Sequence, residues 1–205
     1  QEMVSSFEWA DIVWLEFAND ISAYITNKIP AIKNKTVVCR IHSYEVLNGN
    51  LPSIDFTKIN MLVFVDDHVR EIAFETYPII KKENRTVVIQ NGVNLSQFSY
   101  KERAPGFNIA VVGEISHKKN PSMWIEILSR LVKIDPQYKL NIAGSIQELR
   151  FKYYLENIIH KLGLERNITF HGRVVDILEW YEREGINYLL TSSVFESFGY
   201  SIAEA

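Results

Sequence analysis

The sequence predicts an α/β protein made of two doubly wound units, each built around a parallel sheet. Short apolar runs alternate along the chain with longer mixed segments, and this alternation is typical of βαβ units. Between the two halves the chain is polar from Ser96 to Gly106 and contains Pro105-Gly106, which indicates a linker. We therefore predict a first domain over residues 1–95, a linker over 96–107 and a second domain over 108–205.

The first half carries four expected strands and two expected helices. Each strand is a short apolar run, whereas the helical segments place apolar residues at helical spacing. Pro78 interrupts the second helical segment, because proline removes a backbone donor. The expected strands are Ile12–Leu15, Val37–Ile41, Met61–Val65 and Val87–Gln90, and the expected helices are Glu16–Asn27 and Asp67–Ile80.

The second half repeats this alternation. Asn120 followed by Pro121 is a strong signal for the start of a helix, and Gly163 is a typical helix end. The expected strands are Asn108–Val112, Lys139–Ala143, Ile168–Gly172 and Asn187–Thr191, and the expected helices are Pro121–Ile134, Gln147–Leu162 and Val174–Arg183. Both units are expected to be incomplete, since the first has about four strands and the last helix has barely begun at Ala205. The chain is therefore expected to be an internal fragment.

Composition excludes some classes of function. The formal net charge is −3 and the pI is about 6.0, so the chain has no basic field for nucleic acid. The single cysteine, Cys39, lies in an apolar run and is expected to be a small buried hydrophobe. No apolar stretch approaches the ~20 residues needed to span a bilayer. We expect a cytoplasmic protein, and peripheral association with the inner face of the membrane stays open.

The last ten residues carry the strongest functional signal. Glu196 and Glu204 are eight positions apart, and they follow an apolar run that predicts a buried strand. A Gly-containing loop leads from this strand into a helix that opens at Tyr200. Such a junction presents free backbone N–H groups which, with the helix dipole, suit a diphosphate. Glu204 would then be placed to accept two hydrogen bonds from a vicinal diol such as ribose. The alternative is that the two glutamates lie on a solvated helix face.

Glu196 and Glu204, with Phe198 and Gly199 between them, resemble the E-x7-E signature of the retaining group 1 (family 4) glycosyltransferases. The resemblance implies the GT-B fold, with two Rossmann-like units that are both incomplete here. It also implies that Glu196 contacts the donor sugar, that the Phe198-Gly199 backbone meets the diphosphate, and that Glu204 binds the nucleotide ribose. Tyr200, at the opening of the helix, is counted among the expected substrate-binding residues.

A second strand–loop–helix junction begins at Gly113. In the family that the chain resembles, this loop reads Gly-Arg and, after four residues, Lys-Gly, and its cations hold the donor diphosphate. Gly113 and Lys119 stand at the Gly and Lys positions, which implies a substrate-binding role for both. Glu114 stands at the Arg position, a change expected to weaken diphosphate binding by ~2–5 kcal/mol. Lys118 would compensate in part; the alternative is a solvated lysine pair ahead of a helix.

His42 ends the strand expected over Val37–Ile41. The resemblance implies that it faces the donor sugar, and strand ends of open α/β sheets are where ligands bind. The alternative is a partly buried histidine satisfied by nearby backbone. The segment Ile168–Val174 resembles the strand and loop whose backbone contacts the nucleobase, which makes Val174 a further expected binding residue.

The implied reaction moves a sugar from a nucleotide-diphosphate donor to an acceptor hydroxyl with retention, in glycan or polysaccharide biosynthesis. The leaving phosphate accepts the acceptor's proton, so no protein nucleophile is expected. The resemblance also implies a metal-independent enzyme, and neither a metal nor a cofactor is expected. Asp66-Asp67, the closest acidic pair, fits a helix N-cap. The expected partners are the donor and a glycan or lipid-linked acceptor.

Three alternatives stay open. One is a sugar-nucleotide epimerase of the same fold, and a second is a binding module without catalysis, which Glu114 favours. The third, a Rossmann dehydrogenase, is disfavoured because no G-x-G-x-x-G occurs. The isolated fragment is expected to be weakly active or inert.

Overall fold

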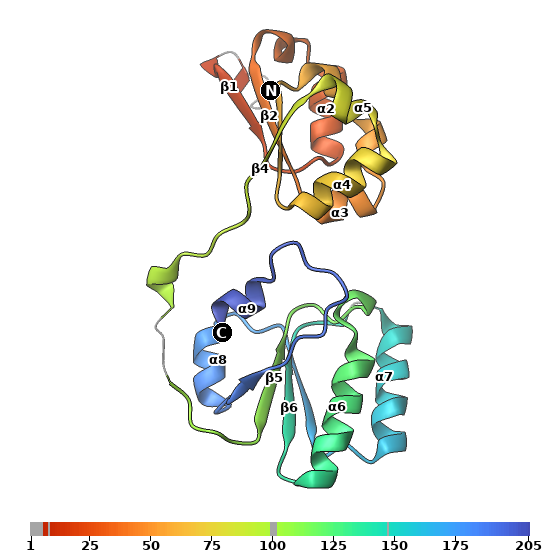
Figure 1. The fold of residues 1–205 in the computed structure, drawn as a ribbon, viewed down its shortest axis with the longest axis vertical. Coiled ribbons are helices and arrows are strands. Elements are labelled where there is room, and N and C mark those ends of the chain that lie inside the picture. Colours follow the sequence, from red (N-terminus) through yellow and green to blue (C-terminus); the bar gives the residue numbers. More distant parts are fainter. Residues whose placement is uncertain (1–5, 8, 99–101, 147) are drawn as a thin grey trace. The chain divides into compact units, whose positions relative to one another are not determined.

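The computed structural model describes residues 6, 7, 9–98, 102–146 and 148–205. The chain divides into two compact units, Gln1–Gly92 and Val93–Ala205 (Figure 1). In this division the residues of the predicted linker, 96–107, fall at the start of the second unit. Each unit contains a four-stranded sheet whose strands pair in parallel, which confirms the predicted α/β class.

The sheet of the first unit has the order β1-β2-β3-β4, so its strands follow one another in space as they do in sequence. The strands are β1 (Ile12–Leu15), β2 (Thr36–Ile41), β3 (Met61–Phe64) and β4 (Arg85–Val88). The helices are α2 (Asp20–Lys28), α3 (Ser43–Leu47), α4 (Asp67–Thr76) and α5 (Ile79–Glu83), and 3-10 turns occupy Pro30–Asn34, Leu51–Ser53 and Phe56–Lys58. The predicted β4 was wrong by two residues, because pairing with β3 begins at Arg85.

Local capping explains where the predicted helices of this unit differ from the observed ones. The first begins at Asp20 and not at Glu16, because the Asn19 side chain accepts hydrogen bonds from the backbone of Ile21 and Ser22. The second is divided into α4 and α5 at Pro78. Asp66 caps α4 as expected, accepting from the backbone of His68 and Val69.

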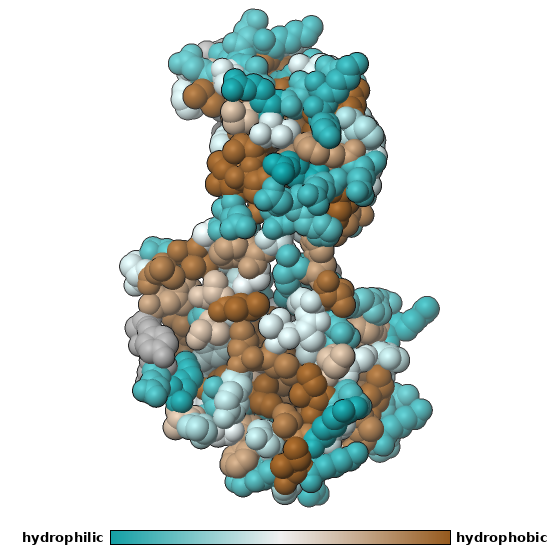
Figure 2. Space-filling model, in the orientation of Figure 1, coloured by the Kyte–Doolittle hydropathy of each residue, from teal (hydrophilic) through white to brown (hydrophobic). Residues whose placement is uncertain are grey.

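The visible surface of both units mixes hydrophilic with hydrophobic side chains (Figure 2). The edge strand β1 presents apolar side chains to solvent, with Ile12 exposed to 65% and Trp14 to 51%. Cys39 of β2 is fully buried, as predicted, and burial, with smaller contributions from nearby carboxylates, raises its pKa to about 12.

The sheet of the second unit has the order β7-β6-β5-β8, which places β5 near its centre. The strands are β5 (Asn108–Val112), β6 (Lys139–Ala143), β7 (Ile168–Gly172) and β8 (Tyr188–Leu189). The helices are α6 (Pro121–Ile134), α7 (Leu149–Leu162), α8 (Ile177–Arg183) and α9 (Tyr200–Glu204), and 3-10 turns occupy Leu95–Gln97 and His117–Lys119. Helix α8 starts three residues later than predicted, because Asp176 caps it by accepting from the Glu179 backbone.

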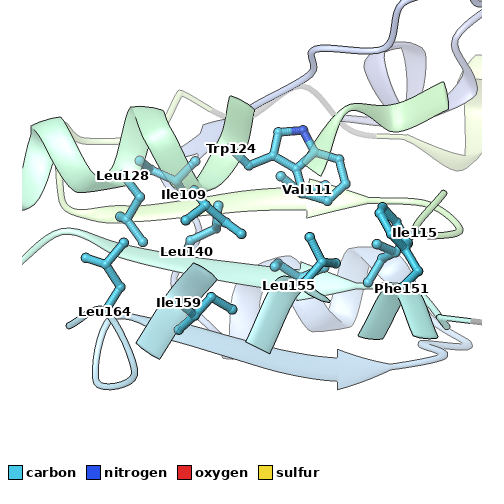
Figure 3. Packing of buried hydrophobic residues seen from close by; sticks show 12 residues of the cluster. Ile109, Val111, Ile115, Trp124, Leu128, Leu140, Phe151, Leu155, Ile159 and Leu164 are labelled. Atoms are coloured by element: carbon cyan, nitrogen blue, oxygen red, sulfur yellow. The ribbon is translucent and has the colours of Figure 1, made fainter. Parts of the chain in front are cut away.

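Helices cover both faces of the second sheet. On one face α6 and α7 pack Trp124, Leu128, Leu155 and Ile159 against the strand residues Ile109, Val111 and Leu140 (Figure 3). On the other, Trp180 and Tyr181 of α8 pack against Ala110 and Ala143. Burial of this apolar surface holds the carboxyl ends of β5 and β6 side by side.

Replacing Leu155 with Ala is expected to destabilise the second unit by about 3 kcal/mol, because the side chain is buried and the truncation leaves a cavity. Urea unfolding followed by tryptophan fluorescence measures the change. Leu149 of the same helix is 63% exposed, so Leu149→Ala is the matched control and should change stability by less than about 0.5 kcal/mol. Equal effects of the two substitutions would show that α7 does not pack as described.

Candidate functional site

The backbones of the loops after β5 and β6 are in close contact at one edge of the site. The Gly113 backbone N–H donates to the Ala143 carbonyl (2.9 Å) and the Ile115 N–H donates to the Ser145 carbonyl (3.0 Å). Gly144 permits this approach, because a Cβ at that position would lie 1.8 Å from the Gly113 carbonyl oxygen. Gly113 itself has a φ of 126°, in the region that favours glycine.

Side-chain and backbone bonds fasten the loop after β8 to the lysine-containing turn His117–Lys119. The Ser192 hydroxyl donates to the carbonyls of Lys119 (3.1 Å) and Asn120 (3.3 Å). The Val194 N–H donates to the Lys118 carbonyl (2.9 Å). Two segments more than 70 residues apart in sequence are thereby held together.

Glu196 is bound by both lysines of that turn. Lys119 Nζ lies 2.6 Å from Glu196 Oε1, and Lys118 Nζ lies 3.1 Å from Oε2. Partial burial acts to raise the pKa of Glu196, but Lys119, Ser193 and Lys118 together outweigh it and hold the pKa below its ordinary value. Glu196 is therefore an ionised group fixed at both oxygens.

One pocket of about 240 Å³ collects most of the predicted residues of the second unit. It is lined by the end of β5, by Lys119 and by the loop that leads into α9. Its lining residues are Val112, Gly113, Lys119, Glu196, Ser197, Phe198, Gly199, Tyr200, Ser201 and Glu204. Glu196 and Glu204 thus face a common pocket and do not form a solvated helix face.

The loop enters α9 through Gly199, whose φ is 76°. No side chain of the described residues caps this helix, so its first backbone N–H groups are left for solvent or a ligand. Glu204 lies at the end of α9, and its carboxylate interacts electrostatically with Tyr181 of α8. Burial, and to a smaller extent the Glu204 carboxylate, raise the pKa of Tyr181 to about 12.

A second pocket, of about 500 Å³, adjoins the first, because Val112, Gly113 and Glu204 line both. Its other lining residues are Glu114, Ala143, Gly144, Ser145, Arg173, Val174, Val175 and Ile177. Val174 therefore lies with the predicted residues, and the unexpected Glu114 shares the pocket with Arg173. Sequence reasoning missed Arg173, although its position in the loop after β7, just before Val174, was a usable signal.

His42 belongs to the first unit, where it follows β2 and is the N-cap residue of α3. Its Nε2 lies 3.3 Å from Glu16 Oε1, and its ring stands 4.9 Å from that of Phe17. Its backbone N–H donates to Glu45 Oε2 (2.9 Å). Glu45 is fully buried, and burial raises its pKa. The imidazole thus has a carboxylate partner, Glu16, which the sequence did not suggest; the role of His42 toward a donor sugar stays a prediction.

Within the ranges that the structure describes, no group of three or more His, Cys, Asp or Glu side chains could hold a metal ion. None of the described helices is long and apolar enough to cross a bilayer.

The sequence pattern of the family described as glycosyl transferases, group 1, matches residues 95–205. The match covers more than half of the chain. The chain belongs to the group 1 glycosyltransferases. The matched range contains both pockets and every predicted site residue except His42.

One relative of this group 1 glycosyltransferase is LpcC, a lipopolysaccharide core biosynthesis mannosyltransferase of Rhizobium leguminosarum bv. viciae. It is 27% identical over an alignment of 130 residues, and the match covers 58% of this chain and 36% of LpcC. The chain therefore spans about a third of the length of this relative.

Solved structures agree on the fold. The pneumococcal O-GlcNAc transferase GtfA, in complex with UDP and GlcNAc, is 18% identical with a TM-score of 0.66, and the match covers 100% of this chain and 42% of GtfA. HepE of Anabaena, in complex with UDP and glucose, is 17% identical with a TM-score of 0.68, and the match covers 100% of this chain and 59% of HepE. These likenesses confirm that this group 1 glycosyltransferase has the two Rossmann-like units of the GT-B fold.

Proposed function

We propose that the complete protein transfers a sugar from a nucleotide-diphosphate donor to an acceptor hydroxyl, with retention at the anomeric carbon, in glycan or polysaccharide biosynthesis. The observation that carries the proposal is that Glu196, Glu204 and Lys119 line one pocket with the uncapped start of α9. The names of LpcC, a mannosyltransferase, and of GtfA, an O-GlcNAc transferase, support a sugar-transfer role. The UDP and glucose bound to HepE support a nucleotide-sugar donor. We place the reaction in the cytoplasm, with a glycan or a lipid-linked acceptor at the inner face of the membrane.

The two adjoining pockets suit the two parts of such a donor. The pocket of about 240 Å³ would take the diphosphate and sugar, and the pocket of about 500 Å³ would take the nucleoside. Glu204 lines both, which is the position a ribose occupies between base and diphosphate. Its carboxylate is suited to accept hydrogen bonds from the two ribose hydroxyls.

Stabilisation of the charge on the leaving group would lower the activation barrier of the reaction. As the bond between the anomeric carbon and the diphosphate oxygen breaks, negative charge develops on the diphosphate. The Lys119 ammonium and the free N–H groups at Gly199 and Tyr200 would stabilise that charge. The acceptor oxygen attacks from the same face, and its proton passes to the departing phosphate oxygen. Glu196 would orient the sugar hydroxyls and stabilise the cationic centre. Because Lys119 and the backbone N–H groups would stabilise the leaving diphosphate, the proposal requires neither a metal nor a cofactor.

Glu114 favours a second candidate, a nucleotide-binding module without catalysis. This carboxylate lines the larger pocket and is exposed, where the family pattern has a phosphate-binding arginine. A sugar-nucleotide epimerase of the same fold is the other alternative, and it would release a free product without an acceptor.

Calorimetry of the complete protein with uridine, guanosine and adenosine diphosphates tests donor binding, and product analysis with and without an acceptor tests the reaction. We expect binding of one diphosphate and a product that requires acceptor. Binding without turnover would support the binding module, and a product from donor alone would support the epimerase. Binding of none of the three would contradict the whole proposal.

Replacing Glu114 with Arg is expected to strengthen binding of the nucleoside diphosphate about tenfold, because a cation replaces an anion in the donor site. This gain is smaller than the ~2–5 kcal/mol expected from the sequence, because Glu114 is exposed and solvent screens its charge. The dissociation constant is measured by calorimetry at two salt concentrations, and the gain should shrink at high salt. Glu126→Arg, at an exposed position of α6, is the matched control for the change in net charge. An equal gain in both variants would mean that Glu114 does not face the donor.

A further inference from the structure

Glu196 has two lysine partners that occupy different places around it. Lys119 lines the pocket of about 240 Å³ and its side chain is 19% exposed. That side chain runs past Gly113, where an added Cβ would meet Lys119 Cε at 3.2 Å. Lys118 is not among the described residues that line this pocket, and its side chain is 41% exposed. Lys119 thus faces the pocket, whereas Lys118 approaches Glu196 from outside it.

In the proposed donor complex Lys119 has two anionic partners. Its ammonium now binds Glu196 Oε1 at 2.6 Å, and the donor diphosphate would enter the same pocket. When Lys119 turns to the diphosphate, Glu196 loses its shorter ion pair at the moment another anion arrives. A part-buried carboxylate beside an anion tends to take up a proton unless a cation stays with it.

Lys118 is placed to be that remaining cation. Its backbone carbonyl accepts from the Val194 N–H (2.9 Å), which fixes it to the loop that carries Glu196. Its Nζ lies 3.1 Å from Glu196 Oε2 and 5.9 Å from the centre of the Phe195 ring. The contact uses the oxygen that Lys119 does not, so it can persist when Lys119 moves.

We propose that Lys118 is a positioning residue that holds Glu196 in place, as a carboxylate, while Lys119 binds the donor diphosphate. The inference rests on the proposed function. It assigns different tasks to two adjacent lysines: Lys119 contributes to donor affinity, and Lys118 contributes to turnover through Glu196. Among the described residues, the charged groups that face Glu196 are Lys118 and Lys119 of the 3-10 turn and Glu204 of α9, which lines the same pocket.

The test compares Lys118→Met, Lys118→Arg and Lys119→Met in the complete protein, with Lys161→Met at an exposed position of α7 as the matched control. Lys118→Met should lower kcat roughly 10- to 100-fold, the usual cost of a misplaced catalytic group, and leave the dissociation constant of the nucleoside diphosphate within about threefold. Lys119→Met should raise that constant by roughly 30-fold or more. Lys118→Arg should restore most of the turnover, and Lys161→Met should change neither quantity.

A pH measurement separates positioning from a general loss of structure. Without Lys118 the pKa of Glu196 rises, so the acid limb of the kcat profile should move to higher pH. A titration of Glu196 by 13C NMR of the carboxyl carbon, assigned with Glu196→Gln, should show the same upward movement without any turnover.

Three results would overturn the inference: an unchanged Glu196 titration in Lys118→Met, a kcat within twofold of the parent, or a loss of diphosphate affinity equal to that of Lys119→Met. The last would make Lys118 a direct ligand of the diphosphate. Failure of the proposed function is distinct, since the unsubstituted protein would then transfer no sugar to an acceptor, whether or not it binds a nucleoside diphosphate. The NMR titration still decides the role of Lys118 in that case.

Discussion

Replacing Glu196 with Gln in the complete protein is expected to lower kcat for sugar transfer about 100- to 1,000-fold, while the fold and nucleotide binding survive. Glutamine keeps the shape of the side chain and can still accept a hydrogen bond from Lys119. It lacks the charge that would stabilise a cationic anomeric centre. The loss should therefore fall on turnover and not on the binding of the nucleoside diphosphate, which contains no sugar at that position.

Turnover is measured with saturating donor, nucleotide affinity by calorimetry, and folding by circular dichroism. Glu204→Gln separates the two carboxylates, because it should weaken nucleotide binding through the ribose contact. Glu126→Gln, on the exposed side of α6, controls for loss of one negative charge. A kcat for Glu196→Gln within about threefold of the parent would show that this carboxylate has no part in the chemistry.

Replacing Gly144 with Ala is expected to destabilise the second unit by at least about 3 kcal/mol and to abolish nucleotide binding. The added Cβ would lie 1.8 Å from the Gly113 carbonyl oxygen and 2.7 Å from the carbonyl carbon. Both atoms belong to backbone that is itself bonded to Ala143, so neither loop can move without losing a hydrogen bond. The relief of the clash must displace Gly113, which lines both pockets.

Denaturant unfolding and calorimetry with the bound nucleotide measure the two effects. Gly92→Ala is the matched control, because nothing lies within 4 Å of the Cβ that it would add. It should change stability by less than about 1 kcal/mol. Normal stability and normal nucleotide binding in Gly144→Ala would refute the close approach of the two loops.

Elements with strong local signals were predicted with their observed bounds. Pro121 after Asn120 marked the start of α6, and continuous apolar runs marked the buried strands. The elements of the second unit predicted without error were Asn108–Val112, Pro121–Ile134, Lys139–Ala143 and Ile168–Gly172. Errors arose where a helix cap or a strand partner decided the bounds of an element. Helix α2 begins only after its N-cap residue Asn19. Strand β8 has two residues, and within the described part of the sheet it pairs only with β5.

The loops of the site were predictable from motifs, but the contacts between them were not. Lys119 was expected to bind a diphosphate. No local sequence pattern predicts that it pairs with Glu196, which lies 77 positions away. The Ser192 bonds to the lysine turn and the contact between Glu16 and His42 are non-local in the same way. Such contacts depend on the docking of β8 beside β5 and of β1 beside β2, which only the folded chain specifies.

The two bonds of the Ser192 hydroxyl have a thermodynamic consequence. They hold the turn that carries Lys119 against the loop that carries Glu196, and both residues line one pocket. A nucleotide bound in that pocket would therefore contact both segments at once. Local unfolding of the C-terminal segment would then require release of the nucleotide. By mass action, each tenfold rise in free nucleotide above its dissociation constant adds about 1.4 kcal/mol to the free energy of that opening.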